Sequence, residues 1–197
     1  MRLVLVPATL LWGAVLLFHA AAAAPATPSP SGGAQNLGDW SVHCVAGSLP
    51  PCEMFQRVQD NAGKRLLNIA IAYEPRQDRY VIQLITPLGV SFARGVRITS
   101  SALSVQTLPY QRCDGAGCYV TGAIERGALD SLGRSDPKAK VTIAPLDGRD
   151  TDLPLSLRGF SDARTAMENL ARKNVAAAAS AKPPAPAPGR QMPAATH

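Results

Sequence analysis

The segment RLLNIAIAY, residues 65–73, alternates two sets of side chains over its whole length. Leu67, Ile69, Ile71 and Tyr73 fall on one side of an extended chain, because successive side chains of a β-strand point to opposite faces. The residues between them, such as Ala70, fall on the other side. The period is two rather than the 3.6 of a helix, and it predicts a β-strand with one face in a core.

Short runs of the same kind lie on both sides of this segment. After the charged break EPRQDR (74–79), YVIQLI (80–85) predicts the returning strand of a hairpin. The other strand-like runs are WSVHC (40–44), CEMFQRV (52–58), GVRITS (95–100), ALSVQTL (102–108), CYVTGAIE (118–125), KVTIAP (140–145) and LPLSLRG (153–159). About eight short strands favour an all-β fold, a sandwich or a barrel, and we predict an antiparallel β-sandwich. SDARTAMENLARK (161–173) predicts a short C-terminal helix.

The alternation also predicts which side chains fill the interior. Burial of one large aliphatic side chain stabilises a fold by ~1.5–3 kcal/mol, so the apolar side of each strand should face inward. The predicted core contains Trp40, Leu67, Ile69, Ile71, Ile82, Leu84, Val120, Ile124, Val141 and Ile143.

The N-terminal residues predict export. One arginine, Arg2, precedes an almost wholly apolar run at residues 3–18, and the alanine-rich stretch HAAAAAP follows. This order is typical of a secretory signal peptide, so residues 1–24 are predicted to be cleaved and the protein to be periplasmic or secreted. An uncleaved membrane anchor is the alternative, but the run contains Pro7 and is slightly short for a hydrocarbon layer of ~30 Å.

Composition divides the remainder into three parts. Residues 25–36 form a Pro/Ser/Gly-rich flexible linker, residues 37–173 the predicted β-sandwich domain, and residues 174–197 a disordered Ala/Pro-rich tail. We predict no integral membrane segment after signal cleavage. The net charge of +6 is scattered and only 5% of residues are aromatic, which argues against a nucleic-acid-binding surface.

Four cysteines follow the predicted cleavage site: Cys44, Cys52, Cys113 and Cys118. An even number of cysteines in an exported chain favours disulfides over a zinc site, whose usual spacing is absent, or a redox centre, which would need CxxC. Four cysteines allow three pairings. We predict the local pairs Cys44–Cys52 and Cys113–Cys118, because prolines and glycines inside both loops turn the chain back on itself.

Residues for nucleophilic or metal chemistry are sparse. His43 is the one histidine within the predicted domain, and no phosphate-binding glycine motif is present, so we predict no cofactor and no metal. Asp147, Asp150 and Asp152 lack the residue order of an EF-hand calcium loop. A carboxylate-based hydrolase stays open as an alternative, with Glu53, Asp78, Asp147 or Asp150 as candidates.

The predicted bridge at Cys113 also indicates a surface. It would hold Tyr110, Gln111 and Arg112 against Tyr119 at a sheet edge. Aromatic and arginine side chains are frequent interface anchors, so this corner is a candidate partner-binding site, with ordinary loop residues as the alternative.

Five segments, taken in order, resemble the invasion-associated locus B family of exported bacterial proteins. They are GDWSVHC, PCEMFQRV, ITPLGVSFARGVRI, PYQRCDGAGCYV and LPLSLRGFSDA, and the resemblance covers residues 37–172. It implies a β-rich domain in the envelope or outside the cell, associated in some members with entry into host cells. It brings no catalytic residues.

Three functions are consistent with these observations. The first is a non-enzymatic binding or adhesion module that contributes to host-cell interaction or invasion. Its partner would be a protein or another component of the envelope or host surface. The second is a structural periplasmic protein without a direct host role, and the third is the hydrolase.

Overall fold

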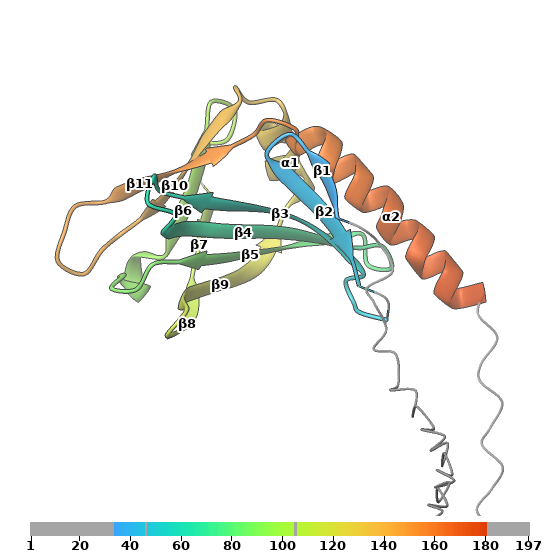
Figure 1. The fold of residues 1–197 in the computed structure, drawn as a ribbon, viewed down its shortest axis with the longest axis horizontal. Helices are drawn as coiled ribbons and strands as arrows, with labels where there is room; N and C mark the ends of the chain where they lie inside the picture. The colour runs from blue at the N-terminus through green and yellow to red at the C-terminus, as the bar shows by residue number, and fades with distance from the viewer. Residues whose placement is uncertain (1–33, 46, 105, 181–197) are drawn as a thin grey trace, which may run out of the picture.

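A computed structural model describes residues 34–45, 47–104 and 106–180. The predicted signal peptide, most of the linker and residues 181–197 of the tail lie outside the described residues. The elements in chain order are β1 (Gln35–Leu37), β2 (Trp40–Cys44), β3 (Cys52–Gln59), β4 (Arg65–Glu74), β5 (Arg79–Thr86), the short 3-10 helix η1 (Phe92–Arg94), β6 (Val96–Ser100), β7 (Gln106–Leu108), β8 (Tyr110–Asp114), β9 (Gly117–Ile124), α1 (Arg126–Gly133), β10 (Lys138–Ile143), β11 (Thr151–Ser156) and α2 (Phe160–Ser180) (Figure 1).

The strands form two antiparallel sheets, which confirms the predicted sandwich. The larger sheet has the order β1-β2-β3-β4-β5-β9-β8, and the smaller one has the order β11-β10-β6-β7. Two of the eleven strands, β1 and β8, were not predicted. β1 has only three residues and begins inside the predicted linker, and β8 is mostly exposed, so neither carries an apolar alternation.

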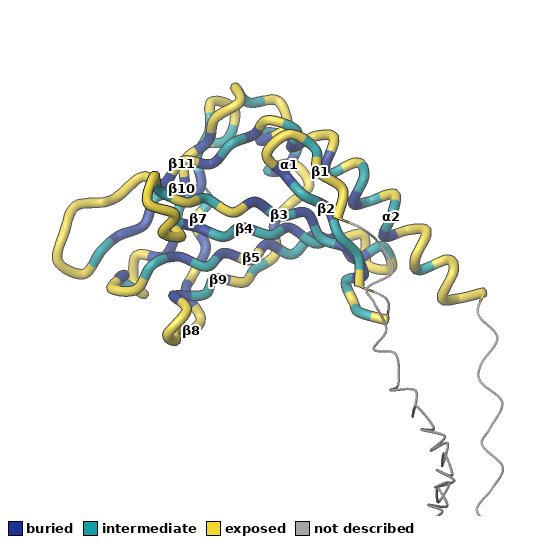
Figure 2. The backbone as a smooth tube through the Cα atoms, in the orientation of Figure 1, coloured by how far each residue is buried: buried dark blue, intermediate teal, exposed yellow. Residues whose placement is uncertain are grey.

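The alternation in β4 has the predicted direction. Leu67, Ile69, Ile71 and Tyr73 are at most 2% exposed, whereas the residues between them from Leu66 to Ala72 are only half-buried. The same alternation of buried and half-buried residues runs along the neighbouring strands (Figure 2). All ten side chains of the predicted core are buried.

Helix α2 is longer than the sequence predicts. It lies along the inner side of the larger sheet, with Phe160, Ala163, Met167 and Ala171 buried at intervals of three or four residues. It continues to Ser180, past the predicted boundary at residue 173. These residues include four consecutive alanines, which favour helix even without burial. No helix of the described residues is long and apolar enough to span a bilayer.

The two sheets are joined through the buried side chain of Gln56 on β3. Its amide nitrogen donates to the carbonyl oxygens of Ser156 (3.0 Å) and Asp39 (3.3 Å), and its amide oxygen accepts from the backbone N–H of Ser156 (3.0 Å). The indole N–H of Trp40 also donates to the carbonyl of Ser156, at 2.9 Å. One buried glutamine therefore links the end of β11 to the start of β2.

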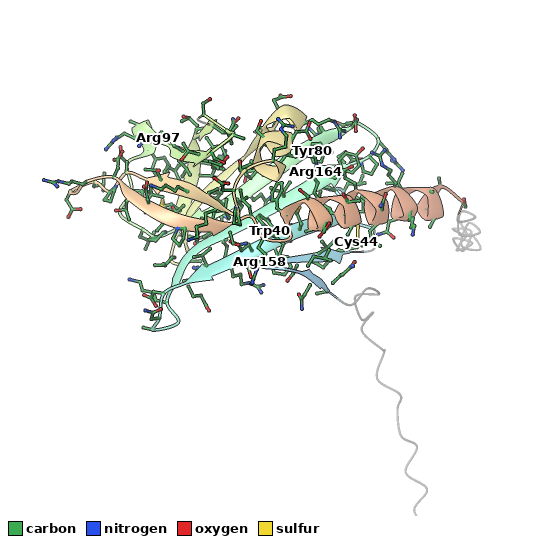
Figure 3. All side chains as sticks on the ribbon, turned by 90° about the horizontal axis from the view of Figure 1, so that it is seen from above. Trp40, Cys44, Tyr80, Arg97, Arg158 and Arg164 are labelled. Carbon is green, nitrogen blue, oxygen red and sulfur yellow. A yellow bond between two sulfur atoms is a disulfide. The ribbon has the colours of Figure 1, made fainter. Side chains whose placement is uncertain are left out.

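Next to this junction two backbone segments, at Gly38 and at Gly159, approach each other too closely to leave room for a side chain. Gly38 and Gly159 both have positive φ, and a Cβ on Gly159 would overlap the carbonyl oxygen of Leu37. Asp39 forms an ion pair with Arg158, which lies close to Trp40 in Figure 3. Glycine is thus required where the turn before β2 meets the turn before α2.

A network of hydrogen bonds and ion pairs connects α1 and α2 to β5. The hydroxyl of Tyr80 donates to Glu168 (2.6 Å) and accepts from Arg126 (2.8 Å), and Arg164 pairs with Asp130 (2.7 Å) and Glu168 (2.9 Å). Burial opposes the charge of Arg164, but these oxygen partners hold its pKa above the usual value. Every member has a partner, so we interpret the network as structural.

Candidate functional site

The larger sheet has two unlike sides. In the described part of the chain, α2 and the smaller sheet both pack on the inner side, where Trp40 contacts Phe160 edge-to-face at 5.3 Å between ring centroids. Leu108 of β7 approaches Gly122 of β9 from the same side. The opposite side, here called the outer face, carries the alternate residues of β2 to β5 and β9. It is therefore the broad sheet surface that the described covering layers leave open.

Three adjoining hollows mark the outer face. Their volumes are about 250, 190 and 230 Å³, and all three are lined in part by the exposed side chain of Gln83 on β5. Ala70 lines two of them and Ala72 one. Small side chains on the central strand leave room between the larger residues of the strands beside it. Two of the three hollows therefore lie beside small side chains of β4.

Polar groups accompany the small residues. His43 and Glu53 face each other across β2 and β3, with 3.3 Å between Nε2 and Oε1. Asn68 stands in the middle of β4, and its Oδ1 atom is buried without a hydrogen-bond partner. A buried carbonyl oxygen without a donor is costly, and a bound donor group would relieve that cost.

Two aromatic rings on the outer face each carry an arginine. The guanidinium of Arg57 lies 4.7 Å from the ring centroid of Phe55, and that of Arg112 lies 3.7 Å from the ring of Tyr119. Arg112 also pairs with Asp114 at 2.5 Å, which raises the pKa of Arg112. One face of each ring is thus covered by an arginine of the same chain.

The structure divides the predicted corner between the two sides of the sheet. Tyr110 is only 7% exposed, and its hydroxyl lies 3.2 Å from Oγ1 of Thr86. Arg112 and Tyr119 instead meet on the outer face. The pairing of β8 with β9 shifts register between Tyr110 and Arg112, and this bulge turns the two side chains to opposite sides. Tyr110 is therefore not part of a shared surface with Arg112 and Tyr119.

Gln111 occupies the bulge itself. Its side-chain nitrogen donates to the carbonyl oxygen of Thr121, and its side-chain oxygen accepts a hydrogen bond from the backbone N–H of Thr121. The side chain thus stands in for the backbone of β8 where the register shifts. This explains why β8 stays paired although its sequence has no regular alternation.

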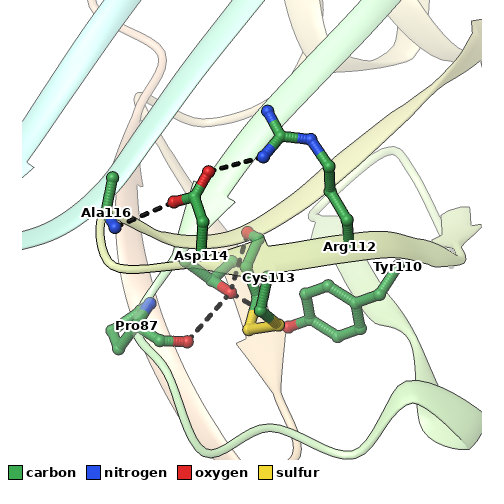
Figure 4. The surroundings of a disulfide bond; sticks show 8 residues. Pro87, Tyr110, Arg112, Cys113, Asp114 and Ala116 are labelled. Atoms are coloured by element: carbon green, nitrogen blue, oxygen red, sulfur yellow. Dashed lines mark hydrogen bonds and ion pairs between the residues drawn. A yellow bond between two sulfur atoms is a disulfide. The ribbon is translucent and has the colours of Figure 1, made fainter.

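Both disulfides connect residues that face each other across neighbouring strands. Cys44 is bonded to Cys52 between β2 and β3, and Cys113 to Cys118 between β8 and β9, which is the local pairing that the sequence predicts. The first closes the loop at residues 45–51, and the second closes the tight turn shown in Figure 4. Two such bonds indicate an oxidising compartment.

Comparison with known proteins matches residues 40–168 to the model of the family described as "Invasion associated locus B (IalB) protein". The chain belongs to the invasion-associated locus B family. A solved structure of that family, the crystal structure of invasion associated protein B from Bartonella henselae, has a similar fold. It is 21% identical, with a TM-score of 0.61, and the match covers 71% of this chain and 98% of that chain. No curated protein matches the chain.

Three of the five segments that carry the resemblance to the invasion-associated locus B family meet at the junction of the two sheets. Asp39 and Trp40 come from GDWSVHC, Ser156 and Arg158 from LPLSLRGFSDA, and Gln56 from PCEMFQRV. These residues bond to one another and fix the sandwich. These motif residues thus have structural roles, while other residues of the five segments, such as His43, Glu53 and Tyr119, line the outer face.

The four candidate carboxylates lie in three separate places. Glu53, on β3, pairs with His43 of β2. Asp78 lies in the turn between β4 and β5 and accepts a hydrogen bond from the hydroxyl of Tyr73. Asp147 and Asp150 lie in the loop between β10 and β11, at the other end of the molecule (Figure 1). Among the described residues, no group of three or more His, Cys, Asp or Glu side chains is placed to hold a metal ion.

The outer face as a whole was not predicted as a site, although the predicted residues Arg112 and Tyr119 lie on it. The hollows are also lined by alanine and glutamine, with asparagine beside them, and none of these residue types signals a chemical role in a sequence. The available signal was the contrast in RLLNIAIAY between the apolar set and the small set that includes Ala70 and Ala72. That contrast predicts an open face, but it does not predict hollows.

Proposed function

We propose that this protein is an exported envelope protein that acts as a binding module, with the outer face as its contact surface. One observation carries the proposal: the open side of the larger sheet has adjoining hollows around Gln83 and a buried Oδ1 of Asn68 without a partner. Hollows with a few convergent polar groups are typical of recognition sites. The partner is a protein or another component of the envelope or host surface.

Export and a non-enzymatic role are parts of the same proposal. The disulfides and the signal-like sequence of residues 1–24 support a periplasmic or secreted location. Membership of the invasion-associated locus B family supports an envelope role, with host-cell interaction as the finer proposal. N-terminal sequencing of the protein from the envelope fraction should find a first residue between Ala21 and Pro25. An intact Met1 on a cytoplasmic species would contradict export.

The contact surface is tested by one charge placed in its centre. Gln83→Arg introduces a long cation where the three hollows meet, at an exposed position that the fold tolerates. Gln77→Arg makes the same change at an exposed residue of the turn between β4 and β5 and is the matched control. Each mature variant is immobilised and exposed to solubilised envelope and to host-cell membranes, and the retained partner is quantified.

We expect Gln83→Arg to retain at least about tenfold less partner than the parent, the effect of disrupting one central interface residue. Gln77→Arg should retain as much as the parent. Equal retention by both variants would remove the outer face from the proposal. Unfolding midpoints of both variants, measured in urea, show that the fold is unchanged.

A structural envelope role is the second candidate. The end of α2, residues 172–180, is almost wholly exposed and extends past the sheet (Figure 1), as a spacer toward another layer would. A partner found only in the envelope extract would favour this role, and a host-membrane partner would favour adhesion. The hydrolase alternative has no comparable support, because Glu53 and Asp78 lie apart from the loop that holds Asp147 and Asp150, and Asp150 is paired with two arginines.

A further inference from the structure

Two loops form a single tip at the end of the sandwich farthest from Ala34 and Ser180, the outermost described residues (Figure 1). The tip consists of residues 87–95, which include η1, and residues 144–150 between β10 and β11. Val90 and Pro145 form an isolated β-bridge, Ser91 N–H donates to the carbonyl of Ala144 at 2.8 Å, and Leu146 N–H donates to that of Gly89 at 2.9 Å. The two loops therefore behave as one rigid unit.

The tip carries most of the exposed apolar bulk of the molecule. Five large apolar side chains are exposed in the described residues, and three of them are Leu88 (57% exposed), Phe92 (47%) and Leu146 (74%). They belong to both loops, in the exposed segments at that end of the sandwich (Figure 2). The other two, Val45 and Leu49, lie in the disulfide-closed loop between β2 and β3.

Together with Arg97 at the start of β6, the tip has a net charge of +1. Arg94 and Arg97 both bind the carboxylate of Asp150, at 2.7 and 2.5 Å, so one acid is shared between two cations. Arg149 is exposed beside them, and Asp147 is the other acid of these loops. From residue 87 to 97 and from 144 to 150 there are thus three arginines and two aspartates, whereas the loop with Val45 and Leu49 has no lysine or arginine.

We propose that this tip inserts into the surface of an anionic lipid membrane. Its leucine and phenylalanine side chains stand on projecting loops, and arginines lie close behind them. Apolar side chains that enter the headgroup region beside cations give interfacial binding that depends on anionic lipid. A protein partner is less well matched, because interface anchors usually fill pockets on compact surfaces, whereas Leu146 is 74% exposed on a long hairpin loop.

The two ends of the described chain lie away from the tip, so insertion leaves the outer face and α2 free. The inference is independent of the proposed contact surface. The tip would contact the membrane, and the outer face of the larger sheet would contact the partner.

Vesicle co-sedimentation tests the proposal. The mature full-length chain is mixed with vesicles of phosphatidylcholine, or of phosphatidylcholine and phosphatidylglycerol in equal parts. The triple variant Leu88→Ser/Phe92→Ser/Leu146→Ser removes the apolar side chains of the tip. Val45→Ser/Leu49→Ser is the matched control for exposed apolar residues elsewhere, and Arg149→Glu reverses one charge of the tip.

The parent should bind the anionic vesicles and bind the neutral ones at least about tenfold more weakly. The triple variant should lose at least about tenfold in affinity for anionic vesicles, and Arg149→Glu should weaken it severalfold. The control should bind as the parent does. Absence of parent binding, equal binding to both vesicle types, or a triple variant that binds like the parent would overturn the proposal. Gel filtration of every variant establishes that it is folded.

Discussion

Replacing Gln56 with leucine removes the amide that joins the two sheets while nearly preserving the volume of the side chain. Gln56 is buried and makes three hydrogen bonds with the backbone of Asp39 and Ser156. The carbonyl of Ser156 would keep its bond from Trp40 at 2.9 Å. The N–H of Ser156 and the carbonyl of Asp39 would each lose the bond from Gln56.

The expected cost follows from these groups. A buried donor left without an acceptor costs about 1–3 kcal/mol, and the carbonyl of Asp39, bonded at 3.3 Å, adds less. The leucine is more apolar than the glutamine and offsets part of the loss. The net destabilisation should be about 2 kcal/mol.

Urea unfolding measures this value. With an m-value of about 2 kcal/mol/M, the midpoint of Gln56→Leu should fall by about 1 M at constant m. In a chain that begins at residue 25, Trp40 is the single tryptophan and reports on the junction directly. Gln83→Leu, the same change at an exposed position of β5, should move the free energy of unfolding by less than about 0.5 kcal/mol. A Gln56→Leu variant as stable as Gln83→Leu would refute the role of this amide.

Three further perturbations test other parts of the fold. Cys113→Ser/Cys118→Ser opens a six-residue loop and should lower the free energy of unfolding by about 2 kcal/mol, as urea midpoints would show; an unchanged midpoint would contradict this. Ile71→Asp buries a charge on the inner side of β4 and should abolish cooperative unfolding, whereas Ala72→Asp, on the outer face, should unfold cooperatively; similar behaviour of the two would invalidate the assignment of faces. Hydrogen bonds from Arg158 lower the pKa of Asp39, and those from Arg97 lower that of Asp150, so these carboxylates stabilise the folded state above the unfolded pKa of about 3.9 and lose that effect as pH falls. The urea midpoint should therefore decrease between pH 5 and pH 3, and a constant or rising midpoint would contradict it.

The predicted binding site at Tyr110, Arg112 and Tyr119 shows that a local sequence pattern does not always predict which side of a sheet a residue faces. Tyr110, Arg112 and Tyr119 lie close in sequence, and the disulfide brings their strands together as predicted. Which side of the sheet each residue faces depends on one extra residue in β8, at Gln111. A bulge shifts every following side chain to the other side, and nothing in the polar sequence of β8 indicates it.

The amino-acid sequence by itself determined the strand pattern, the core positions such as Ile71, the local disulfides and the family. These depend on side-chain period, turn residues and cysteine spacing, which are properties of neighbours along the chain. Only the tertiary structure decided what covers the apolar side of the larger sheet. The cover depends on α2, which packs on β2 and β3 although it follows them by more than a hundred residues in the chain, and on the amide of Gln56, which bonds to Ser156 of the other sheet. Such contacts between distant residues form only when the whole chain is folded, so the hollows of the outer face and the loop tip had no local signal.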